Sequence, residues 1–258
     1  MARSDLVVRF AGEGGQGLLS TATGLATAFT QVGYHSQTFA TFPSQIVGGP
    51  TWMQARISTK EILSRGDTVD VLVAFNEQAY NNHRDEVSDS GIIIYDSEQF
   101  QPDDKSKSLG MEFGKLAKST GNTRAANMVV MGALANVAGV PLDLLENFIK
   151  KRWASPRYGP EIVESNIKAL LLGHQEGDKN GLTLGELDKP IPPKHDQILI
   201  NGNDAIAIGA FYSGLKFYVG YPISPATTIL TLSLIHISEP TRPRLRSYAV
   251  FCMKKKKG

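Results

Sequence analysis

The stretch Gly12-Glu13-Gly14-Gly15-Gln16-Gly17 decides how the first two thirds of this chain fold. It follows residues 6–11, an apolar run typical of a buried strand. It precedes residues 18–29, where apolar side chains recur at helical spacing. Strand, glycine turn and helix therefore succeed one another. Gly12, Gly14 and Gly17 match the pattern G-x-G-x-x-G in the context that this pattern requires.

A glycine turn in this place predicts a site for an anionic ligand. Without side chains the ligand can approach the main chain, and the helix N-terminus offers free N–H groups and partial positive charge. The alternative is a tight strand-to-helix turn that binds nothing. NAD is disfavoured, because its ribose needs an Asp or Glu about 20 residues further on, at the end of the next strand. No acid occurs between Glu13 and Glu61.

A second glycine pair, Gly48-Gly49, stands with Pro50 just before residues 51–58, which alternate as a half-buried strand does. Its position predicts that the two glycine loops meet at one edge of a sheet. The alternative is a hairpin loop that is small only for the sake of packing.

The elements that follow indicate an α/β fold. Residues 69–75 and 91–96 are typical of central strands, and Asn76 suits the N-cap of a short helix. Residues 97–110 are polar and are expected to be irregular. Further helices are expected at 112–119, 123–138, 141–153 and 155–172. Residues 1–174 are therefore predicted to form one domain, a mostly parallel sheet with helices on both faces.

Composition changes after residue 174. Residues 175–196 are rich in Gly, Pro and charge, which predicts a linker. Residues 197–230 then predict a strand at 197–200, a helix at 205–213 and a strand at 215–219. That second strand ends in a Gly-Tyr-Pro loop, where open α/β sheets place ligands. About 30 residues cannot bury a core alone, so this unit is interpreted as the truncated start of a second α/β domain.

The composition of the 258 residues, 41% hydrophobic and 20% charged, is that of an ordinary soluble chain. No apolar run reaches the roughly 18 residues of a membrane helix, and the N-terminus lacks a signal-peptide pattern. The single cysteine excludes a disulfide framework, and it excludes an iron–sulfur or zinc site carried by this chain alone. These features predict a cytoplasmic protein without a membrane partner.

Four motifs in order resemble the 2-oxoacid:ferredoxin (acceptor) oxidoreductases, in the form where a gamma domain precedes the alpha subunit. The gamma-type motifs are residues 12–17 and 43–50, and the alpha-type motifs are residues 202–207 and 220–225. Two positions depart from the usual pattern. Ser224 stands where the family usually has threonine, and Pro50 follows the double glycine.

The resemblance implies oxidative decarboxylation of a 2-oxoacid to acyl-CoA and CO2, with reduction of ferredoxin. Thiamine diphosphate with Mg²⁺ and a 4Fe–4S cluster would belong mainly to a separate beta subunit, the expected partner. 2-Oxoglutarate is the favoured substrate, with pyruvate and branched-chain acids left open. The second domain would be the start of a thiamine-pyrimidine-binding domain. A coenzyme A- or nucleotide-binding module without chemistry of its own is the alternative function.

The resemblance also assigns residues to the ligands, although it assigns no catalytic residue and no metal ligand in this chain. The 2-oxoacid would contact Tyr221, Pro222 and Ser224, with the hydroxyl of Ser224 as donor. The coenzyme A side would use the two glycine loops: Gly12, Gly14, Gly15, Gln16, Gly17, Gly48 and Gly49.

Residues 231–258 are predicted not to belong to the natural protein. Residues 232–242 resemble the translation of a transposase-type sequencing adapter, and residues 247–252 resemble that of the distal primer of the same library. His236 and Cys252 are therefore not offered as ligands or nucleophiles. The tail holds seven basic residues and one acid, so without it the net charge falls from +2 to −4. Basic charge is thus no argument for a nucleic-acid partner.

Overall fold

The computed structural model describes residues 3–41, 49–155, 158–179, 181–193, 195, 197–215, 217–220, 226–230 and 249–252. The chain divides into two units, Met1–Leu199 and Ile200–Gly258, and each is described by itself. Among the described residues, no helix combines the length and the apolar character needed to cross a membrane.

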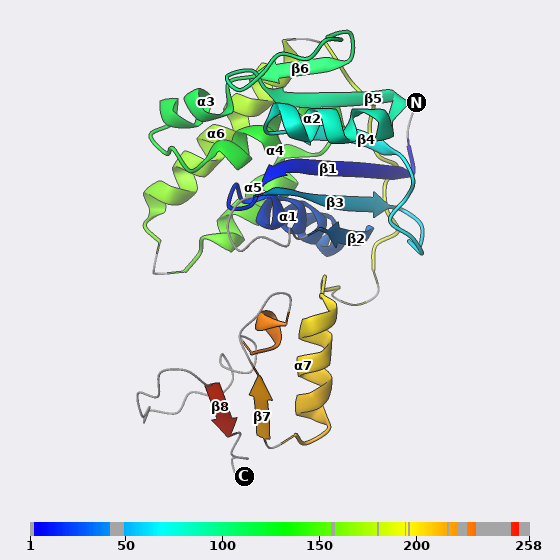
Figure 1. Cartoon of the computed structure of the whole chain (residues 1–258), viewed down its shortest axis with the longest axis vertical. Coiled ribbons are helices and arrows are strands. Elements are labelled where there is room, and N and C mark those ends of the chain that lie inside the picture. Colours follow the sequence, from blue (N-terminus) through cyan, green and yellow to red (C-terminus); the bar gives the residue numbers. More distant parts are fainter. Residues whose placement is uncertain are drawn as a thin grey trace. The chain divides into compact units, whose positions relative to one another are not determined.

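The first unit is built on a six-stranded sheet with the strand order β2-β3-β1-β4-β5-β6 (Figure 1). Strands β1, β4, β5 and β6 pair in parallel, whereas β3 runs antiparallel to both β1 and β2. The predicted α/β class with a mostly parallel sheet is therefore confirmed. The strands are β1 (Asp5–Glu13), β2 (His35–Ala40), β3 (Pro50–Ser58), β4 (Val69–Ala74), β5 (Val87–Asp96) and β6 (Ser108–Met111).

Helices cover both faces of this sheet, as predicted. On one face α1 (Leu18–Gln31) packs against β1, β2 and β3, and α4 (Ala126–Val137) packs against β5. On the other face α2 (Glu77–His83) packs against β1 and β4. Alternation along β1 produces this division, because Phe10 belongs to the larger core and Ala11 to the smaller one. The remaining helices are α3 (Phe113–Ser119), the 3₁₀ helix η1 (Arg84–Glu86), α5 (Leu142–Arg152) and α6 (Pro160–Asp178).

Two glycines let α4 and α6 pack with their main chains close together. A Cβ atom at Gly132 of α4 would overlap the carbonyl oxygen of Leu170, and one at Gly173 of α6 would overlap the carbonyl oxygen of Val129. Nearly every residue of α4 is buried. This helix is therefore a central element of the larger core.

Some boundaries differ from the predictions made from the sequence. Residues 97–110 were expected to be irregular, but Ser108–Met111 forms β6, which pairs in parallel with β5. Its burial alternates along the strand, but four residues are too few for such alternation to indicate a strand. Helix α6 begins at Pro160 and runs to Asp178, into the predicted linker. Asn76 caps α2 as predicted, since its side chain accepts a hydrogen bond of 2.8 Å from the N–H of Ala79.

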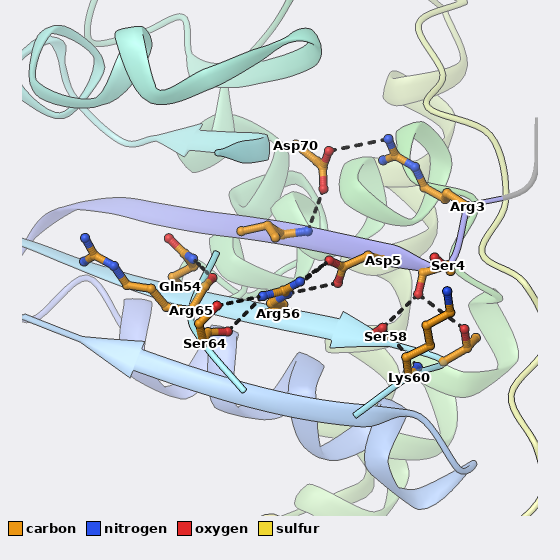
Figure 2. Close-up of polar contacts among 12 residues, drawn as sticks. Arg3, Ser4, Asp5, Gln54, Arg56, Ser58, Lys60, Ser64, Arg65 and Asp70 are labelled. Atoms are coloured by element: carbon orange, nitrogen blue, oxygen red, sulfur yellow. Dashed lines mark hydrogen bonds and ion pairs between the residues drawn. The ribbon is translucent and has the colours of Figure 1, made fainter. Parts of the chain in front are cut away.

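A polar cluster fixes the edge of the sheet where β1 begins (Figure 2). Arg56 on β3 forms an ion pair of 2.6 Å with Asp5 on β1, and it donates to the carbonyl oxygen of Ser64 at 3.0 Å. Asp70 accepts a hydrogen bond of 2.8 Å from the N–H of Val7. Burial raises the pKa of Asp70, although this hydrogen bond acts in the opposite direction. The cluster ties β1, β3, β4 and the loop after β3 together.

A buried arginine joins β1, β3 and η1 on the face covered by α2. Arg9 is 1% exposed, and its guanidinium lies 4.4 Å from the ring centre of Trp52. Its Nη1 lies 2.6 Å from Oε1 of Glu86, and its Nη2 donates to Oε1 of Gln54 at 2.9 Å. The hydrogen bond from Arg9 lowers the pKa of Glu86, while burial lowers the pKa of His83. This buried charge is well paired, as its desolvation requires.

The second unit contains α7 (Gly202–Tyr212) and the antiparallel pair β7 (Phe217–Gly220) and β8 (Ala249–Cys252). The side chain of Asn201 caps α7 by accepting from the N–H of Asp204 at 2.9 Å. No residue of α7 is buried. The strand predicted at 197–200 does not form.

Candidate functional site

The glycine turn joins the end of β1 to the start of α1 through left-handed main-chain conformations. Gly15 has φ 97° and Gly17 has φ 77°, values that favour glycine. At Gly15 an added Cβ would meet no atom within 4 Å, so the conformation alone demands glycine there. At Gly17 it would also overlap the side-chain amide of Asn127.

Two side chains hold the turn in this shape. The N–H of Glu13 donates to Oε1 of Gln16 at 2.8 Å, and Nδ2 of Asn127 donates to the carbonyl oxygen of Gln16 at 3.0 Å. The side-chain amide oxygen of Gln16, a predicted ligand contact, is therefore already engaged in a hydrogen bond within the turn. Asn127, in the first turn of α4, was missed from the sequence. Its partner lies 111 positions earlier in the chain, so no local pattern indicates the contact.

The second glycine loop meets the first one, as the sequence predicts. The N–H of Gly14 donates to the carbonyl oxygen of Gly49 at 3.3 Å, and Glu13 pairs with Pro50 in the β1–β3 register. Gly49 has φ 83°. Gly48 lies outside the described residues. The two loops thus share the edge of the sheet at which β1 ends.

A cavity of about 390 Å³ opens between the glycine turn, the first turn of α1 and the ends of β2 and β3. Gly14, Gly15 and Gly17 line it, whereas Gly12, Gln16 and Gly49 are not among its described lining residues. Apolar residues also line it, namely Leu18, Leu19, Trp52 and Met53, although the ring of Trp52 packs against the smaller core on the opposite face of the sheet. The site combines exposed main chain with apolar surface.

The electrostatics of this cavity favour an anion near α1. Within the described part of the chain, the N–H groups of Leu18, Leu19 and Ser20 have no hydrogen-bond partner, as is usual at a helix N-terminus. The first turn of α1 has no acidic residue. Glu13 is the one carboxylate among the described lining residues, and its Oε1 accepts from Nδ2 of Asn76 at 3.4 Å.

A larger cavity, about 620 Å³, lies between the α3–α4 connection and α6, but it is a weaker candidate. Arg124 and Lys168 line it together with Glu161 and Glu164, so charges of both signs are mixed there. No described group of three or more His, Cys, Asp or Glu side chains is arranged to hold a metal ion.

The predicted 2-oxoacid contacts Tyr221, Pro222 and Ser224 all lie outside the described residues. Their roles stay predictions. The geometry of the candidate site therefore rests on the glycine turn, its bracing residue Asn127 and the cavity beside them.

Comparison with curated proteins finds relatives that are oxidoreductase subunits. The 2-oxoglutarate oxidoreductase subunit KorA of Mycobacterium tuberculosis is 28% identical over 265 residues, covering 88% of this chain and 40% of that protein. The ketoisovalerate oxidoreductase subunit VorA of Methanothermobacter thermautotrophicus is 30% identical over 180 residues, covering 68% of this chain and 37% of that protein. The chain spans about two fifths of the length of these relatives.

Among solved structures, 2-oxoglutarate:ferredoxin oxidoreductase from Magnetococcus marinus matches with a TM-score of 0.78 and 31% identity. The match covers 91% of this chain and 41% of that chain, which was solved with 2-oxoglutarate, coenzyme A and succinyl-CoA bound. The family model for pyruvate ferredoxin/flavodoxin oxidoreductase matches residues 7–176, about two thirds of the chain, and includes the glycine turn and its cavity. The chain therefore belongs to the pyruvate ferredoxin/flavodoxin oxidoreductase family.

Proposed function

We propose that the whole protein is a subunit of a 2-oxoacid:ferredoxin oxidoreductase, which converts a 2-oxoacid and coenzyme A to acyl-CoA and CO2 and passes two electrons to ferredoxin. The observation that carries this proposal is the family match over residues 7–176. 2-Oxoglutarate is the proposed substrate, because KorA and the oxidoreductase from Magnetococcus marinus, both named for 2-oxoglutarate, match 88% and 91% of the chain. The ketoisovalerate relatives match only about two thirds of it.

We propose that different subunits bind the cofactors and the substrates. Thiamine diphosphate, when bound, supplies the electron sink for decarboxylation. The described residues offer no group of carboxylates, histidines or cysteines for its Mg²⁺, and the chain has one cysteine where a cluster needs several. By resemblance to the family, we propose that both groups belong mainly to a beta subunit and that this chain binds coenzyme A and forms part of the 2-oxoacid site.

Coenzyme A is proposed to bind at the glycine turn. A phosphate there would accept hydrogen bonds from the N–H groups of Leu18, Leu19 and Ser20, at the positive end of α1. The exposed side chain of Leu19 offers apolar surface to the uncharged arm of the ligand. The structure from Magnetococcus marinus, similar over 91% of this chain, has coenzyme A bound.

A charge placed at Leu19 tests this site without disturbing the fold. Leu19 lines the cavity in the first turn of α1 and is 50% exposed. A carboxylate there stabilises the helix by about 0.3–1 kcal/mol through the helix dipole, yet it repels a bound phosphate. We expect Leu19→Glu to bind coenzyme A at least 10-fold more weakly in calorimetric titration, with a melting temperature no lower than wild type.

The matched control is Leu19→Gln, which has the same shape as Leu19→Glu without its charge. It should keep an affinity within about threefold of wild type. Equal affinities for the two variants would show that no phosphate lies at the start of α1, and they would return the glycine turn to a purely structural role.

A variant at Ser224 tests whether this chain contributes to the 2-oxoacid site. In the complex of the full-length protein with its beta subunit, Ser224→Ala removes one proposed hydrogen bond to a charged group, which is worth about 1.5–3 kcal/mol. The kcat/KM for the 2-oxoacid should fall about 10- to 150-fold, while coenzyme A affinity stays unchanged. Wild-type kinetics on every 2-oxoacid would remove this residue from the site.

The second candidate function is a coenzyme A- or nucleotide-binding module without chemistry of its own. One observation favours it: all described lining residues of the glycine-turn cavity belong to the first unit. Binding of coenzyme A by a chain that never co-purifies with a thiamine-binding partner would support this module. Recovery of 2-oxoacid oxidation on adding the beta subunit to the full-length protein would exclude it.

Residues 231–258 are proposed to derive from a sequencing adapter, on the basis of the sequence alone. The genomic DNA beyond the codon for Leu230 tests this directly. We expect it to encode the rest of an alpha domain, with a beta-subunit gene adjacent. A genomic reading frame that encodes Ile235-His236-Ile237 in place would refute it.

A further inference from the structure

The chain continues past α6 as an extended segment along the edge of the sheet at which β1 begins (Figure 1). We call residues 181–188 the strap. Arg3, just before β1, pairs with Leu187 as a parallel bridge. The N–H of Arg3 donates to the carbonyl oxygen of Glu186 at 3.0 Å, and the N–H of Asp188 donates to the carbonyl oxygen of Arg3 at 2.8 Å. The strap is therefore joined to the start of β1 through its main chain.

Two further hydrogen bonds fix the strap to the ends of α4 and α1. The N–H of Leu184 donates to the carbonyl oxygen of Val137, in the last turn of α4, at 2.6 Å. The hydroxyl of Tyr34, which follows α1 and is 8% exposed, donates to the carbonyl oxygen of Asp188 at 3.0 Å. At Gly139 an added Cβ would lie 2.8 Å from main-chain atoms of the strap. The strap thus contacts three parts of the first unit that are far apart in the sequence.

Leucine side chains add apolar contact to these hydrogen bonds. Leu182, Leu184 and Leu187 are partly buried and pack against the larger core. Thr183 and Glu186, which lie between them, are exposed. An extended segment with the pattern Leu-x-Leu-x-x-Leu therefore presents apolar side chains to the first unit and polar ones to water, and burial of such side chains drives the binding of peptides as well as folding.

The strap lies outside the region that the family match covers, since that match ends at residue 176. Residues 175–196, which include the strap, are rich in Gly, Pro and charge, a composition typical of flexible linkers. Four hydrogen bonds and three leucine side chains nevertheless attach the strap to the first unit. Its contacts are those of a peptide ligand that is carried on the same chain.

We propose that the edge of the first unit at which β1 begins is a docking surface for the strap, and that this docking holds the chain beyond the strap to the first unit independently of the covalent connection at α6. A chain cut between α6 and the strap then stays together as two associated pieces. The main chain and leucines of the strap form one side of the contact, and Arg3, Tyr34 and Val137 form the other. This docking does not depend on coenzyme A.

A cut between α6 and the strap tests whether docking alone holds the chain together. A protease recognition site inserted after Lys179, in the full chain with an N-terminal affinity tag, allows the cut without removing any contact of the strap. The uncut variant should melt as wild type does. After the cut, the piece that contains the strap should stay bound to the tagged piece through affinity purification and gel filtration. Separation of the two pieces would overturn the proposal.

A double variant, Leu184→Ala/Leu187→Ala, removes apolar contact from the docking. It should raise the dissociation constant of the two pieces about 10-fold or more, measured by sedimentation over a dilution series of the cut chain. The matched control is Ile191→Ala/Ile198→Ala, which truncates two aliphatic side chains that are 83% and 76% exposed. It should leave the dissociation constant unchanged. Equal dissociation constants for the two variants would show that the pieces associate through other contacts.

Hydrogen exchange tests the docking without any substitution. In the uncut wild-type chain, the N–H groups of Leu184 and Asp188 donate to main-chain oxygens of the first unit, so they should exchange about 10-fold or more slowly than in an unstructured peptide. The N–H groups of Lys189 and Ile191 have no hydrogen-bond partner within the described ranges and serve as the freely exchanging reference. Exchange of Leu184 and Asp188 at the reference rate would contradict the docking.

Discussion

We expect Gly132→Ala to destabilise the first unit, because α4 and α6 touch through their main chains at this glycine. An added Cβ would overlap the carbonyl oxygen of Leu170 and lie 2.7 Å from the main-chain nitrogen of His174. Main-chain atoms cannot rotate away as the tip of a side chain can, so the helices must separate. Overfilling a packed core costs about 1–3 kcal/mol, and an overlap with two main-chain atoms places this case at the upper end.

The substitution also stabilises the helix by about 1 kcal/mol, because alanine has a higher helix propensity than glycine. The net loss is therefore about 2 kcal/mol, which lowers the melting temperature of a unit of this size by about 4–8 °C. Gly173→Ala should behave alike, because its Cβ would overlap the carbonyl oxygen of Val129. In the double variant the two losses should add incompletely, since one separation of the helices relieves both overlaps.

The assay is thermal unfolding followed by circular dichroism, with Gly114→Ala as the matched control. Gly114 lies within α3, and the nearest atom to an added Cβ is Oε2 of Glu98 at 3.2 Å, the tip of a flexible side chain. That variant should melt at or slightly above wild type. Gly132→Ala melting as high as Gly114→Ala, or fully additive losses in the double variant, would refute the close packing of α4 on α6.

Three further predictions concern a hydrogen bond, two pKa values and an exposed segment. Asn127→Ala removes one neutral hydrogen bond to the glycine turn and should weaken coenzyme A binding about 2- to 13-fold in calorimetry; unchanged affinity would show that the turn needs no brace. Glu86 and His83 both have lowered pKa values. Unfolding by urea should therefore become easier as pH falls below the ordinary histidine pKa of 6.5 and again below the glutamate value of 4.5. Glu86→Gln should remove the second step and enlarge the first, because Glu86 raises the pKa of His83. Limited proteolysis should cut between residues 189 and 198, where Ile191 is 83% exposed, and mass spectrometry should recover an intact first unit; equal cutting within 60–130 would contradict the proposed domain division.

Local sequence patterns were sufficient to predict the elements whose own residues show a hydrophobic period or a turn motif. The glycine turn, its flanking strand and helix, and the meeting of the two glycine loops follow from residue order and from the alternation of the sheet. Strand β6 was missed because the alternation within Ser108–Met111 extends over only four residues. It exists because the edge of β5 offers hydrogen-bond partners from Ile93 to Asp96, a tertiary cause that a local period cannot contain.

Contacts between residues far apart in the sequence could not be predicted for the same reason. Arg9 interrupts an otherwise apolar strand, and its partners Gln54 and Glu86 lie 45 and 77 positions further along the chain. Asn127 and Gln16 are separated by 111 positions. Tertiary packing of β1, β3 and α4 brings these polar groups together. Their contacts can therefore be recognised only in the folded structure.

The glycines show most directly how one residue type serves different physical ends in this family. Gly15 is required by its left-handed φ of 97°, since its added Cβ would touch nothing. Gly24 lies within a regular helix and is required by the ring of Phe148, which packs against α1 from α5. The first glycine exposes the main chain to a ligand, and the second lets α5 lie close to the same helix. One residue type therefore shapes the start of α1 through its main-chain conformation and the middle of α1 through its lack of a side chain.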